Sequence, residues 1–96
     1  MSPITIDVIN NIENPHFVIR GAYNDLLRNK RLLLSFKRLG YFSDNQIICI
    51  PFQEETQIQI LQELQRILEK FGFTQKLTEK TKQDVESFTR EEAAFN

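Results

Sequence analysis

The sequence predicts an α+β domain, with a two-layer, ββαββα-like antiparallel sheet, two helices on one face, and a further C-terminal helical segment. Three observations predict this fold. Short segments near the N-terminus alternate apolar and polar residues, as half-buried strands do. Two longer segments repeat apolar residues at helical spacing, and each is followed by a glycine. A chain of 96 residues also has room for one hydrophobic core but not for two.

The first two strands are predicted on either side of a polar loop. Residues 3–9 read PITIDVI, in which isoleucine and valine alternate with threonine and aspartate. Residues 10–15 are rich in asparagine and end in proline, which is typical of a turn. Residues 16–23 are again β-branched and aromatic. The two segments therefore predict a hairpin.

A helix is predicted from a cap at Asn24 or Asp25 to Leu39, closed by Gly40. At about 100° per residue, its apolar residues share one face and its cations share the other. Leu27 and Leu34 are exceptions, because they point into the basic face. Unless another element covers them, they form an apolar strip bordered by cations.

A second hairpin is predicted over residues 41–52, with a turn at Ser43, Asp44 and Asn45 and a longer strand over residues 46–52. Pro51 cannot donate a hydrogen bond to a neighbouring strand. It therefore indicates either a strand at the edge of the sheet or the end of a strand.

The clearest helix is predicted over residues 53–72. At helical spacing, six apolar residues fall within an arc of roughly 120°. They are Ile60, Leu61, Leu64, Ile67, Leu68 and Phe71. Gly72 follows as a residue that tolerates a left-handed cap. This apolar stripe has to pack on the strands that precede it.

We divide the chain into an α+β domain, residues 1–73, and a polar helical extension, residues 74–96. Thr78 or Thr81 can start a helix in the extension, and residues 89–92 read TREE, the form of a capping box. Few residues follow that start signal. This favours the front end of a longer polypeptide leading into a further domain, and the alternative is a frayed C-terminus.

Composition excludes several classes of protein. The apolar fraction of 41% and charged fraction of 26% are those of a soluble globular protein. No apolar run reaches the ~18 residues of a membrane span, and no signal peptide is evident, so we expect a cytoplasmic protein without a membrane partner. One cysteine and one histidine, Cys49 and His16, cannot form a disulfide framework or an ordinary zinc site.

No catalytic motif is found, and we expect this chain to have no enzymatic activity, no cofactor and no small-molecule substrate. The carboxylate pairs at 54–55 and 91–92 sit at predicted helix starts, where they complement the helix dipole. His16 has no nucleophile beside it in the sequence, and Cys49 lies in an apolar segment. The three glycines are isolated and form no phosphate loop.

The one constellation that suggests a function is the basic helix face. Residues 20–38 contain six cations and one anion, a net charge of +5 within a chain of net charge −1. Nucleic-acid binding needs several cations on a rigid element. The predicted contact residues are Arg28, Lys30, Arg31, Lys37 and Arg38. Alternatively, Leu27 and Leu34, or an exposed edge strand, would form a protein-docking surface.

Residues 16–96 resemble the N-terminal accessory region that precedes the ATPase core in some bacterial Swi/Snf-like and DEAD/DEAH-type helicases. The resemblance is carried by a strand ending at Tyr23, an apolar and basic helix, a strand ending at Ile50-Pro51, and an Ile/Leu-periodic helix. The ATPase motifs are absent, so a helicase activity would reside in a longer protein. The resemblance implies a role in DNA engagement or in docking onto the cognate motor domain.

Overall fold

The computed structural model describes the backbone of residues 4–94 and the side chains of residues 4–86. Its strands are β1 (Ile4–Ile9), β2 (His16–Arg20), β3 (Phe42–Asp44), β4 (Ile47–Pro51) and β5 (Gln75–Leu77). Its helices are α1 (Tyr23–Arg28), α2 (Lys30–Arg38), the 3-10 turn η1 (Glu54–Thr56), α3 (Gln57–Lys70) and α4 (Glu79–Ala94). The predicted α+β fold class is confirmed.

The five strands form one mixed sheet in the order β3-β4-β2-β1-β5. The two hairpin pairs, β1–β2 and β3–β4, are antiparallel, as predicted, and the pair β2–β4, which was not predicted, is antiparallel too. Strand β5 was not predicted, and it runs parallel to β1, with Thr5 opposite Lys76. The sheet therefore continues past residue 73, where we placed the start of the polar extension.

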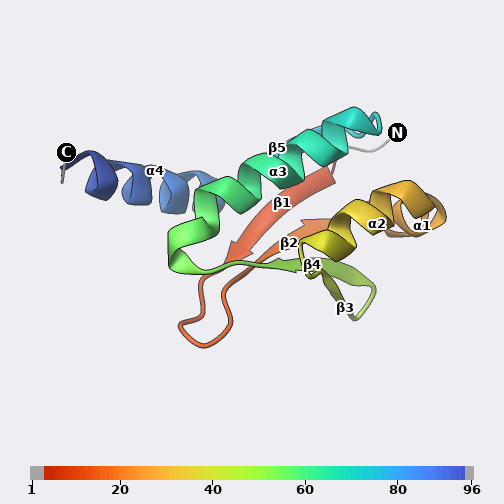
Figure 1. Ribbon diagram of the computed structural model, residues 1–96, viewed down its shortest axis with the longest axis horizontal. Coiled ribbons are helices and arrows are strands. Elements are labelled where there is room, and N and C mark those ends of the chain that lie inside the picture. Colours follow the sequence, from red (N-terminus) through yellow and green to blue (C-terminus); the bar gives the residue numbers. More distant parts are fainter. Residues whose placement is uncertain (1–3, 95–96) are drawn as a thin grey trace.

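Helices α1, α2 and α3 lie on one side of the sheet (Figure 1). Successive side chains of a strand point to opposite sides of the sheet. The register places Ile6 opposite Ile19 and Phe17 opposite Ile50, so these side chains share the side that faces the helices. Against them pack Leu32 and Phe36 of α2, both fully buried. From α3, four residues of the predicted stripe are buried, Leu61, Leu64, Ile67 and Leu68, and Ile60 and Phe71 are partly buried.

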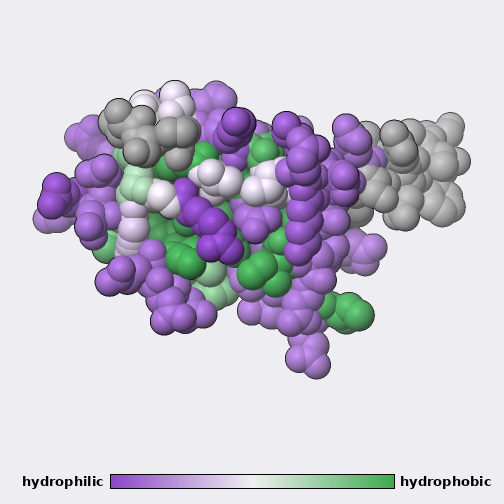
Figure 2. Space-filling model, turned by 180° about the vertical axis from the view of Figure 1, so that it is seen from behind, coloured by the Kyte–Doolittle hydropathy of each residue, from purple (hydrophilic) through white to green (hydrophobic). Residues whose placement is uncertain are grey.

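The opposite side of the sheet is not covered by α1, α2 or α3 (Figure 1). Its central side chains include Asp7, Val18 and Cys49, which the strand register places next to one another. Seen from behind in Figure 2, hydrophobic side chains form several separate patches among hydrophilic ones. On this side, Asp7 Oδ2 forms an ion pair with Arg20 Nη2 at 3.9 Å.

The second hairpin differs in detail from the prediction. The turn between β3 and β4 consists of Asn45 and Gln46, both at positive φ (49° and 60°), which is the two-residue type I′ hairpin turn. Pro51 is the last residue of β4, so its interpretation as a strand end is confirmed. Strand β4 lies between β3 and β2, but its pairing with β3 stops at Cys49, and Pro51 pairs with β2 alone. The edges of the sheet are β3 and β5.

Helix α4 is anchored to β1 by two threonines. The Thr78 hydroxyl accepts from the Thr81 amide (3.2 Å) and caps the helix, as predicted, and it also donates to Asp7 Oδ1 (3.0 Å). The buried Thr81 hydroxyl donates to the carbonyl of Ile6 (3.1 Å). The helix then runs through residues 89–92 without interruption, so no separate helix starts there. The capping-box side chains lie outside the described residues.

Replacing Leu64 by alanine should lower the free energy of unfolding by about 3 kcal/mol, because a fully buried leucine leaves a cavity. Leu34→Ala is the matched control, since the same atoms are removed from a side chain that is 60% exposed. It should change stability by less than about 0.5 kcal/mol. Urea denaturation of both variants measures the difference, and equal losses would contradict the assignment of the core.

Candidate functional site

The basic segment consists of two helices joined at Asn29, rather than the single predicted helix. Asn29 has an extended conformation (φ −92°, ψ 94°), and its side-chain oxygen accepts from the Leu32 amide (3.1 Å), which caps α2. Helix α1 starts after Ala22, which has a left-handed conformation and makes no side-chain cap, so the predicted cap at Asn24 or Asp25 is wrong. Gly40 follows α2 with φ of +80°, as a cap residue should.

The apolar side chains of the two helices determine which face is turned outward. Leu26 of α1 and Leu32 and Phe36 of α2 are buried in the core. The Phe36 ring also packs near Tyr41, with ring centroids 6.3 Å apart. Because these side chains fix the rotation of α2, the residues about half a turn away must point to solvent.

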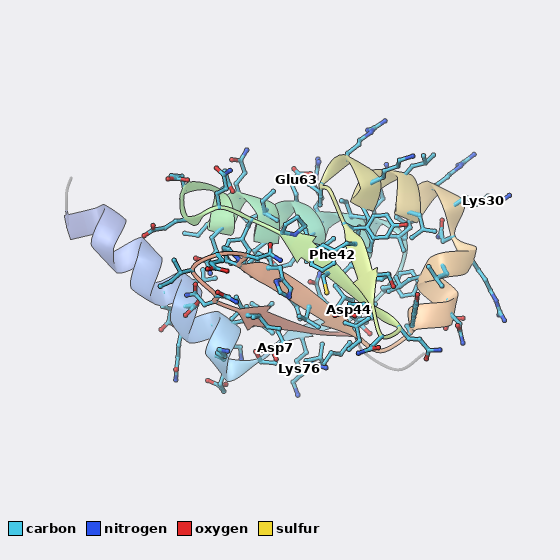
Figure 3. The ribbon with its side chains drawn as sticks, turned by 90° about the horizontal axis from the view of Figure 1, so that it is seen from below. Asp7, Lys30, Phe42, Asp44, Glu63 and Lys76 are labelled. Atoms are coloured by element: carbon cyan, nitrogen blue, oxygen red, sulfur yellow. The ribbon has the colours of Figure 1, made fainter. Side chains whose placement is uncertain are left out.

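All five predicted contact cations are exposed. Arg28 ends α1, and the other four lie on α2 in two pairs seven residues apart, Lys30 with Lys37 and Arg31 with Arg38. Seven residues span about 10 Å along a helix. Figure 3 shows Lys30 on the outer side of the helix, directed away from the sheet. Among the described side chains, none of the five has a carboxylate partner within ion-pair distance.

The two leucines singled out in the sequence are also exposed. Leu27 on α1 is 39% exposed and Leu34 on α2 is 60% exposed. At about 100° per residue, Leu34 falls between the two rows of cations on α2. The break at Asn29 separates Leu27 from it, so the two leucines do not lie along one helix. The apolar part of the basic face is therefore centred on Leu34.

Two further cations adjoin this face and were not predicted. A groove of about 580 Å³ lies between α2 and α3, and its lining includes Arg38 of α2 with Arg66 and Lys70 of α3, besides the carboxylates Glu63 and Glu69. Arg66 is paired with Glu63 (2.7 Å), and the Lys70 ammonium lies 5.9 Å from the centre of the Phe71 ring. The only sequence signal for these cations is their spacing of four residues on the polar side of α3.

Neither Cys49 nor His16 has the surroundings of a catalytic group. Cys49 is 4% exposed, and burial raises the pKa of its thiol; the charge of Asp44 also raises it, whereas Arg20 lowers it. A raised pKa disfavours the reactive thiolate. His16 Nδ1 is 2.9 Å from the carbonyl oxygen of Asn14, and its ring packs edge-on near Phe42.

No metal site or membrane-spanning element is found in the part of the chain that the structure describes. No three side chains among His, Cys, Asp and Glu are grouped to hold an ion there. No helix of that part is long and apolar enough to cross a bilayer.

Comparisons with known proteins identify no similar protein. No protein-family model, no curated protein and no solved structure matches the chain. The helicase resemblance seen in the sequence therefore stays an expectation.

Replacing Asn29 by alanine should lower the free energy of unfolding by about 1 kcal/mol, because the cap of α2 is lost. Asn24→Ala is the matched control, since Asn24 is an exposed asparagine inside α1 with no cap role. It should leave stability within about 0.5 kcal/mol. Thermal and urea denaturation measure both, and an unchanged Asn29→Ala variant would show that the side-chain cap contributes nothing.

Proposed function

We propose that this chain is a non-catalytic module that contacts nucleic acid through the basic face of α2, with Arg28 of α1 beside it. One observation carries the proposal: five exposed cations stand on two packed helices, and no described carboxylate pairs with them. Cations that already neutralise carboxylates would have less to gain from phosphate groups. Unpaired cations on a rigid element are what phosphate binding requires.

The position of the face also supports a contact with an extended polyanion. Arg38 stands both on the face and in the groove between α2 and α3, which Arg66 and Lys70 also line, together with the carboxylates of Glu63 and Glu69. A strand that follows α2 could therefore reach cations of α3. Arg66 is the weaker candidate of the two, because Glu63 already binds it at 2.7 Å.

The helicase resemblance gives this contact a biological setting. We propose that the chain is the N-terminal accessory module of a larger, helicase-like DNA-processing protein of bacterial type, whose ATPase motor lies in another part of that protein. The module would hold DNA near the motor or dock onto the motor domain, and the motor would supply all of the catalysis.

A protein-docking role is the second candidate, and the exposure of Leu34 favours it. An apolar side chain that is 60% exposed and flanked by cations is typical of a docking surface for an acidic, partly apolar partner. The cognate motor domain would be such a partner. The two candidates use the same face, but only phosphate contacts would give affinity for nucleic acid of any sequence.

Reversing two cations of the face, as Lys30→Glu with Lys37→Glu, should weaken binding to labelled duplex or single-stranded DNA by about tenfold or more at low salt. The melting temperature should be unchanged within a few degrees, because both side chains are exposed. Fluorescence anisotropy and thermal denaturation measure the two effects.

The matched control is Lys76→Glu with Lys80→Glu, which makes the same charge change at two exposed lysines of β5 and α4, remote from α2. Figure 3 shows Lys76 far from Lys30. Equal losses for both pairs of substitutions would mean that only net charge matters. Undiminished affinity of the α2 variant would contradict the proposed contact.

A further inference from the structure

The end of the molecule opposite α1 and α2 carries a groove of about 990 Å³. It is bounded by the loop between β1 and β2, by the segment from Pro51 through η1, and by the first turns of α4. Phe52 and the two prolines Pro15 and Pro51 supply apolar surface within it. In Figure 1 the loop and η1 lie left of the centre, on the side where α4 extends, and α1 and α2 lie on the right.

Four carboxylates and no cation line this groove among the described residues. Asp84 is held in place, because its Oδ2 accepts from Asn10 Nδ2 (2.8 Å) and from Gln57 Nε2 (3.4 Å). Glu13, Glu54 and Glu55 are exposed, and no described cation pairs with them. The groove therefore combines apolar surface with unpaired negative charge.

The outer face of α2 has the complementary composition. Leu34 supplies an exposed apolar side chain, and Lys30, Arg31, Lys37 and Arg38 surround it with unpaired positive charge. The helix is a convex, rigid surface, whereas the acidic site is concave. None of these charged side chains forms an ion pair with another described residue. The two surfaces could therefore form ion pairs with each other without breaking existing ones.

From this match we propose that the acidic groove of one molecule receives the α2 face of a second copy. A chain cannot dock α2 in its own groove, because the two surfaces lie toward opposite ends of the molecule (Figure 1). The contact would join two different surfaces, so an open assembly leaves one groove and one α2 face free at its ends, whereas a closed ring leaves none. Association would therefore either grow head to tail or close into a ring, and a ring of two is a dimer in which each groove holds the α2 face of the other copy.

This inference does not rest on nucleic-acid binding, and its test contains no nucleic acid. It does use the same α2 face, so the two partners would compete. Because the attraction is between exposed charges, salt should weaken it strongly.

Analytical ultracentrifugation of the chain across a range of concentrations tests the proposal at about 50 mM and about 0.5 M NaCl. The average mass at low salt should rise with concentration from 11.3 kDa, the mass of one chain, to that of a dimer or a larger assembly. At high salt the average mass should stay at that of one chain. A mass that stays at 11.3 kDa at low salt overturns the proposal.

Two double variants test which surfaces form the contact between copies. Lys37→Glu with Arg38→Glu disables the helix face, and Glu13→Lys with Glu55→Lys disables the groove. Each alone should stay monomeric at low salt, and an equimolar mixture should form a dimer that does not grow, because only one competent face and one competent groove remain. Glu13→Lys alone, in a loop, serves where the pair of groove substitutions unfolds the chain, and should weaken association.

The outcomes separate this proposal from its rivals. Association of either double variant by itself, or a mixture that stays monomeric although wild type associates, overturns the pairing of these two surfaces. A wild-type mass that stops at the dimer is the reciprocal pair, in which each groove holds the other copy's α2 face, and a double variant that still dimerises by itself overturns it. Because no nucleic acid is present in these measurements, failure of self-association leaves the proposed function standing.

Discussion

Everything in this fold depends on one packing contact, the burial of α2 and α3 against a single face of the sheet. Leu32, Phe36 and Leu64 are all fully buried there, beside the strand residues Ile6 and Ile48. Removing this much apolar surface from water is the main source of stability in a small domain. The same contact fixes how each helix is rotated, and so it decides which charged residues face solvent.

The charges that face solvent are placed apart rather than paired. The cations Lys37 and Arg38 stand on α2 and the carboxylates Glu54 and Glu55 on η1, and the three ion pairs among the described side chains involve none of them. Exposed ion pairs contribute little to stability. Leaving these charges unpaired thus costs the fold little, and it leaves both surfaces available to a partner of opposite charge.

The sequence predicts what periodicity controls and misses what tertiary contacts decide. The buried face of α3 was predicted correctly, because Leu64 and Leu68 lie in a regular apolar stripe. The break at Asn29 was missed, since the apolar stripe of α1 and α2 continues across it. Strand β5 has only three residues and no alternation, and its pairing with β1 depends on the turn after Gly72. The acidic groove could not be predicted, because its carboxylates come from three separate segments.

The salt dependence of DNA binding by the unmodified chain tests most directly whether the cations of α2 are available to phosphates. With four or five phosphate contacts, the logarithm of the association constant should fall against the logarithm of salt concentration with a slope of about −4 for duplex DNA. Absence of binding at low salt, or binding with a slope near zero, would contradict a contact made by the basic face.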